Sequence, residues 1–128
     1  MVLRSSHFNF TTSDRMITKQ ELTGLFDDLR ANAPWDINQP SLWSYFFADP
    51  DRAKLERAAP LLKLLGYQQV GLYLSDKENP ADPDLWWLQI EKVEKHTVDT
   101  LFKRNQQFYQ FATAQGLESY DGMDVGPA

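Results

Sequence analysis

Two hydrophobic periods alternate along the chain from residue 41 onward, and the order of these segments is the strongest constraint on its fold. Alternating or aromatic-rich runs predict strands, because successive side chains of a strand point to opposite faces of a sheet. Apolar residues three and four positions apart predict amphipathic helices. In chain order the segments are a strand at 42–47, a helix at 49–66, strands at 67–74 and 85–94, a helix at 97–116 and a strand at 119–126.

This β-α-β-β-α-β order predicts an α+β fold of the ferredoxin-like, split βαβ type. Four antiparallel strands form one sheet in such a fold, and both helices cover one of its faces. The second face then has to be polar, covered by another segment, or buried against a second copy of the chain.

Residues at the ends of the two helices predict how each helix starts and continues. Asp49 is expected to cap the first helix, with Pro50 in its first position, where proline is tolerated. Pro60 interrupts the apolar stripe and predicts a kink or a break. Thr97 is expected to cap the second helix, and Asn105, which lies near its apolar stripe, is expected to be a hydrogen-bonded polar core residue.

A further helix is predicted before this unit. Thr18 and Glu21 have the spacing of a capping box, and Ile17 and Leu22 have that of a hydrophobic staple. Pro34 predicts the end of the helix, because the residue before a proline avoids the helical conformation. This N-terminal helix is a candidate cover for the second face of the sheet.

The N-terminal sixteen residues show no clear period and are expected to form a loose arm. We therefore interpret residues 1–40 as an N-terminal arm and helix, and residues 41–128 as the ferredoxin-like domain.

Charge and cysteine content narrow the classes of function. The formal net charge of the 128 residues is −5, and cysteine is absent. An acidic chain is a poor general nucleic-acid binder, because such binding depends on neutralising phosphates, and it favours a basic protein partner. The absence of cysteine excludes disulfides and thiolate metal sites, and it fits a cytoplasmic location. No stretch approaches the ~20 apolar residues of a membrane span.

The sequence contains no recognisable catalytic or metal-binding pattern. His7 and His96 are the two histidines, and they lie far apart in the sequence, so zinc lacks its usual ligands. We predict no metal, no cofactor and no enzymatic activity, and we interpret His96 as a structural or solvated residue. The alternative is a small hydrolase that uses an Asp or Glu together with His96.

Acidic residues gather near the last predicted strand. Glu118, Asp121 and Asp124 would form a small acidic rim there. The rim is most simply a solvated edge, and a docking patch for a basic partner is the functional alternative. A divalent-cation site is a third interpretation, which needs more oxygen ligands from a shaped loop.

Aromatic residues offer a different function. We expect six of them to share the sheet face away from the helices, where they would form a stacking platform for single-stranded RNA. Because the chain is acidic, burial under the N-terminal helix or a second subunit is the favoured interpretation of that face. The six residues are Trp43, Tyr45, Phe47, Tyr67, Tyr73 and Trp87.

Two runs of sequence resemble the regulator of ribonuclease activity B family. The first is Asp-Arg-Ala-Lys-Leu-Glu-Arg-Ala-Ala at 51–59, followed by Leu-Gly-Tyr at 65–67, and the second is Tyr-Asp-Gly at 120–122, after the last helix. The likeness covers about residues 42–126. It implies a ferredoxin-like domain that acts by binding, and the best-known members are inhibitors that bind ribonuclease E and alter messenger RNA decay.

These observations together predict a non-enzymatic regulator that binds another protein, either a ribonuclease or a basic protein segment. A single-stranded RNA-binding module and the small hydrolase stay open as alternatives. The candidate partner-binding residues are Glu118, Tyr120, Asp121 and Asp124, with Trp87 and Glu91 behind them.

Overall fold

The computed structural model describes residues 8–10, 16–77 and 79–128, which form three helices and five strands. The predicted β-α-β-β-α-β order, with one helix before it, is confirmed. In chain order the elements are β1 (Phe8–Phe10), α1 (Lys19–Asn32), β2 (Ser41–Asp49), α2 (Arg52–Leu64), β3 (Gln68–Leu74), β4 (Trp86–Glu94), α3 (Val98–Ala114) and β5 (Ser119–Pro127).

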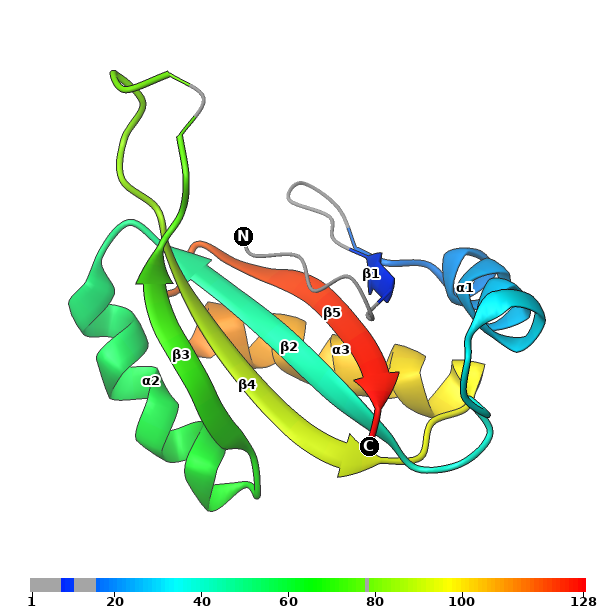
Figure 1. The fold of residues 1–128 in the computed structure, drawn as a ribbon. Coiled ribbons are helices and arrows are strands. Elements are labelled where there is room, and N and C mark those ends of the chain that lie inside the picture. The colour runs from blue at the N-terminus through cyan, green and yellow to red at the C-terminus, as the bar shows by residue number, and fades with distance from the viewer. Residues whose placement is uncertain (1–7, 11–15, 78) are drawn as a thin grey trace.

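The strands form one antiparallel sheet in the order β1-β5-β2-β4-β3 (Figure 1). Strand β4 lies between β2 and β3, and β2 lies between β4 and β5, so each βαβ unit is split by a strand of the other. This is the predicted four-stranded ferredoxin-like core. Strand β1 extends it by pairing with β5, so the expectation of a loose arm is wrong for residues 8–10.

Helix α1 extends the helical layer, and the structure does not place it over the second face of the sheet. Figure 1 shows α3 passing behind the sheet and α1 beyond the β1 side, near the start of α3. The Phe26 ring lies 6.0 Å from that of Trp43, and the Ile17 amide donates to the Tyr109 hydroxyl at 2.9 Å. Leu22 is buried in the same core cluster. The apolar side chains of α1 therefore pack against α3 and the edge of the core.

The cap residues predicted from the sequence are observed at two of the three helices, and the cap of α2 lies two residues later than predicted. The predicted capping box at Thr18 and the predicted cap at Thr97 are both confirmed. Asp49 does not cap α2, because the cap is Asp51, whose carboxylate accepts from the Ala53 amide. Asp49 instead accepts from two backbone amides, that of Asp51 at 2.7 Å and that of Glu118 at 2.9 Å. It thereby ties the start of α2 to the start of β5.

Helix α2 continues through Pro60 to its end at Leu64, so Pro60 does not end the helix. Proline has no amide hydrogen, so the break in the hydrogen-bond ladder is limited to the one bond that residue 60 cannot donate. The helix then closes at Gly66, whose φ of +100° is the left-handed conformation that favours glycine. The amide of Gly66 donates to the carbonyl of Lys63, and that of Tyr67 donates to the carbonyl of Leu62, which is a Schellman arrangement. None of the helices in the described ranges is long and apolar enough to cross a membrane.

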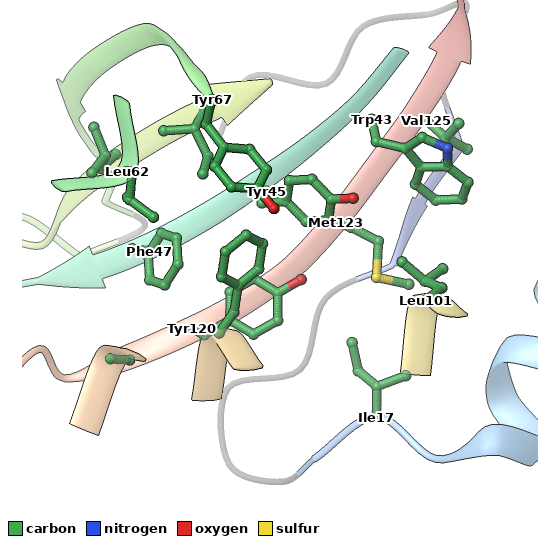
Figure 2. Close-up of a cluster of buried hydrophobic side chains, with 14 of the residues drawn as sticks. Ile17, Trp43, Tyr45, Phe47, Leu62, Tyr67, Leu101, Tyr120, Met123 and Val125 are labelled. Carbon is green, nitrogen blue, oxygen red and sulfur yellow. The ribbon is translucent and has the colours of Figure 1, made fainter. Parts of the chain in front are cut away.

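Aromatic side chains form the centre of the core between the sheet and the helices (Figure 2). Phe108 of α3 has four aromatic neighbours with ring centroids between 4.8 and 5.3 Å away, namely Tyr45, Phe47, Tyr67 and Tyr120. Asn105, as predicted, is a buried and hydrogen-bonded core residue, since it accepts from the Tyr120 hydroxyl at 2.6 Å.

The predicted aromatic platform on the second face is therefore wrong for four of its six residues. Trp43, Tyr45, Phe47 and Tyr67 belong to the core on the helical side. Tyr73 and Trp87 belong to a smaller cluster with Phe46 and Ala48 on the other side of the sheet. The sequence misled because Phe46 and Phe47 are adjacent, so the period of two in β2 does not say which aromatic residue faces the helices.

Two glycines give a matched test of these conformations. Gly24→Ala should raise the free energy of unfolding by about 0.5–1 kcal/mol, because the exposed interior of α1 has room for the methyl group and alanine favours helix. Gly66→Ala should lower it by about 1–2 kcal/mol, because alanine is strained at positive φ. Urea denaturation measures both free energies of unfolding. If the two substitutions changed them equally, Gly66 would not have the left-handed conformation described for the closing turn of α2.

Candidate functional site

A half-buried carboxylate on β4, held by several donors, is the most unusual polar feature of the helical face. Leu88 and Ile90 point into the core, so the alternation of β4 places Lys92 and Glu94 on the same face. The Glu94 side chain is only 12% exposed. A charge in such a place is costly unless it is paired and hydrogen-bonded.

Three side chains surround the Glu94 carboxylate, and together the four form what we call the Glu94 network. The Tyr45 hydroxyl donates to Oε2 at 2.6 Å. The Arg104 Nη1 donates to both oxygens, at 2.9 and 2.7 Å. The His96 Nε2 lies 3.3 Å from Oε2. The network therefore joins β2, β4, α3 and the connection between β4 and α3.

Hydrogen bonding decides the protonation state of the network. Burial alone raises the pKa of the Glu94 carboxyl, but hydrogen bonds from His96, Tyr45 and Arg104 outweigh it and lower that pKa from 4.5 to about 2. Burial and the neighbouring Glu94 raise the pKa of Tyr45 well above 10.0. At neutral pH the carboxylate is thus ionised beside a protonated phenol and a guanidinium.

The geometry of His96 bears on the hydrolase alternative. Its ring is close to a carboxylate, as that alternative requires, but the residue is only 5% exposed and both of its nitrogens have partners. Nε2 lies 2.9 Å from the Tyr45 hydroxyl, and Nδ1 lies 2.9 Å from the Thr100 hydroxyl. The edge-to-face contact with Trp43 encloses the ring further. This arrangement fits a structural role, because both ring nitrogens are engaged by side chains of the protein itself.

A pocket of about 340 Å³ adjoins the network on its solvent side, and we call it the Tyr67 pocket. The Lys92 ammonium lies 5.2 Å and the Arg104 guanidinium 5.5 Å from the centroid of the Tyr67 ring. Burial raises the pKa of the Tyr67 hydroxyl to about 12, against the opposing effect of Arg104. The pocket is lined by Leu65, Tyr67, Lys92, Arg104, Gln107, Phe108 and Phe111.

The six candidate partner-binding residues do not form one solvent-exposed surface. Tyr120 lies in the core, and the side chains of Asp121 and Asp124 are buried in the central part of β5. Glu118 is exposed just before β5, and its amide donates to Asp49 at the end of β2. The predicted acidic rim is thus reduced to one exposed carboxylate.

Trp87 and Glu91 lie on the second face of the sheet, as does Asp124, which pairs with the same residue of β2, Ser44, as Glu91 does. Trp87 is buried in the small cluster with Phe46, and it pairs with Ala48 of β2. Glu91 is half-buried and pairs with Ser44 near the middle of the same strand. Glu91 and Glu118 are therefore the two acidic candidates with solvent access, and they lie apart, Glu91 beside Ser44 in the middle of β2 and Glu118 beside Asp49 at its end. Among the described residues, no three acidic or histidine side chains are grouped so that they could hold a metal ion.

The sequence prediction missed Glu94, Lys92 and Arg104. A signal for the first two was present, since the period of two that places Leu88 and Ile90 in the core continues to both. Arg104 stands four residues before the core residue Phe108, on the same side of α3.

The Glu94 network predicts a pH-dependent stability. Glu94→Gln should lower the free energy of unfolding at pH 7 by about 3 kcal/mol, since it leaves Arg104 without its carboxylate. The folded-state pKa of Glu94 lies below its ordinary value, so this contribution is present above about pH 4.5 and is lost as the pH falls toward about 2. Urea denaturation at several pH values should show the two proteins converging in acid.

A control is available on α2. Glu56 forms an exposed ion pair with Arg52, so Glu56→Gln should change the free energy of unfolding by less than about 0.5 kcal/mol at any pH. A difference between the native protein and Glu94→Gln that stays constant from pH 7 to pH 3 would show that the carboxylate is not held by this network.

Comparison with known proteins gives one match. The family model described as regulator of ribonuclease activity B matches residues 19–125, which include every described element except β1 and the last two residues of β5. No curated protein matches the chain, and no solved structure does. The match spans most of the 128 residues and agrees with the resemblance carried by the motifs at 51–59, 65–67 and 120–122. The chain therefore belongs to the regulator of ribonuclease activity B family.

Proposed function

We propose that this protein is a non-enzymatic regulator that binds a ribonuclease of the ribonuclease E type in the cytoplasm and inhibits it, so that it modulates RNA decay. The family match over residues 19–125 is the observation that carries the proposal. The engagement of both His96 nitrogens within the protein also supports a binding function over a hydrolytic one.

The charge of the chain supports a basic partner. With a formal net charge of −5, the protein attracts a segment rich in arginine and lysine. Glu118 and Glu91 are the candidate contacts whose side chains reach solvent. Asp121 and Asp124 are buried, so in this proposal they make no direct contact. Charges such as those of Glu118 and Glu91 act mainly on the rate of association and on its salt dependence.

An inhibition assay tests the proposal. A purified ribonuclease of the E type cleaves a fluorescent RNA, and the full chain should slow the cleavage. The double variant Glu91→Lys/Glu118→Lys should weaken the inhibition about tenfold at low salt and less at high salt, because screening reduces the charge effect. Two Asp→Lys changes outside the proposed contact, at Asp82 and Asp27, give the same change in net charge at exposed positions on the β3–β4 loop and α1.

The assay tests the regulatory function and the assignment of the contact residues separately. An unaltered cleavage rate at a large excess of the chain would refute the regulator proposal for this nuclease. Equal losses in the Glu double variant and the Asp control would refute the assignment of Glu91 and Glu118 as contacts, and would leave only a general effect of charge.

A further inference from the structure

The Tyr67 pocket concentrates positive charge in an acidic protein. Lys92 and Arg104 flank the same aromatic ring, and Glu94 is the carboxylate that pairs with Arg104. None of the ion pairs found in the described part of the chain involves Lys92. Two cations and one anion thus leave a local surplus of positive charge in a concave site.

The Glu94 network fixes the guanidinium in place. Both hydrogen bonds to Glu94 leave from Nη1 of Arg104, so the carboxylate uses only one nitrogen of the guanidinium fork. A guanidinium carries five N–H donors, so further donors remain on Arg104, which lines the pocket. Because Glu94 is in turn held by Tyr45, the orientation of Arg104 is set before any ligand arrives.

The rest of the pocket is largely apolar. Phe108 and Phe111 of α3 and Leu65 at the end of α2 supply apolar surface, and the exposed Gln107 adds a further polar group at the rim. A volume of about 340 Å³ is in the range of small-molecule sites, which combine apolar walls with a few placed polar groups. This lining suits a ligand with an apolar body and one anionic end.

We propose that the Tyr67 pocket binds a small free carboxylic acid with an aromatic or branched apolar body. The carboxylate lies between the Lys92 ammonium and the Arg104 guanidinium, and the apolar body lies against Phe108, Phe111 and Leu65. Tyr67 keeps its proton and donates to the carboxylate at the base of the site. This inference does not depend on the proposed regulation of a ribonuclease.

Nuclear magnetic resonance titration of the full ¹⁵N-labelled chain tests the site with phenylacetate and with its uncharged analogue phenylacetamide. Phenylacetate should produce saturable shifts of the backbone amide signals of Tyr67, Lys92 and Gln107, and phenylacetamide should produce none. Sodium chloride at the same concentration serves as the control for unspecific anion effects.

Matched lysine variants locate the charge. Lys92→Gln should weaken phenylacetate binding about tenfold, which corresponds to the loss of one charge-assisted hydrogen bond. Lys92→Arg should retain binding, and Lys95→Gln, at an exposed position just after β4, should leave it unchanged. Absence of saturable shifts at tens of millimolar phenylacetate, or equal shifts with phenylacetamide or sodium chloride, would overturn the proposal. So would equal affinities of Lys92→Gln and Lys95→Gln.

Discussion

The half-buried carboxylate of Glu94, with the donors around it, is the interaction on which the arrangement of the helical face depends. Removing a carboxylate from water costs several kcal/mol, and here the cost is offset by donors from Tyr45, His96 and Arg104. Because these donors come from β2, α3 and the connection before it, they meet only when α3 crosses the sheet at one position. Apolar packing around Phe108 tolerates small displacements, whereas a charge held by 2.6–2.9 Å hydrogen bonds does not. The same restraint orients Arg104 toward the Tyr67 pocket, so fold and pocket share one polar anchor.

Much of the fold could be predicted from the sequence, because the information was local. The helices are marked by caps and by closing glycines such as Gly66, and the strands by a period of two. Pairing in the sheet follows from the split βαβ order. Errors arose where a decision depended on tertiary context. Asp49 and Asp51 are both acceptable helix caps. Asp49 instead accepts a hydrogen bond from the amide of Glu118, and the local sequence cannot reveal this long-range contact. Likewise, adjacent aromatic residues in β2 left the choice of face to the packing against Phe108.

The candidate site was less predictable, because the sequence shows which residues are charged and the fold decides which are accessible. Asp121 and Asp124 have the character of docking residues, yet both side chains are buried in β5. Glu94 has the character of a solvated residue at a strand end, yet it is enclosed. The alternation of β4 contained that information, since Glu94 is in phase with Leu88 and Ile90, but the role of Arg104 required the position of α3. The family resemblance was carried by turn and helix motifs, which report the fold more directly than they report a contact surface.

The place of β2 in the sheet has a consequence for synthesis of the protein. Both strands that flank β2 follow it in the chain, and β5 is the last of the five described strands. During translation, the aromatic residues of β2 are made before the residues of α3 and β5 that they contact. The Asp49 carboxylate likewise lacks its donor, the Glu118 amide, which lies 69 positions further along the chain. Contacts of such high sequence separation slow folding and prolong the exposure of strand edges. The centre of this sheet is therefore complete only after β5 has been made, and a nascent chain that ends before β5 leaves one edge of the strongly aromatic strand β2 without its partner.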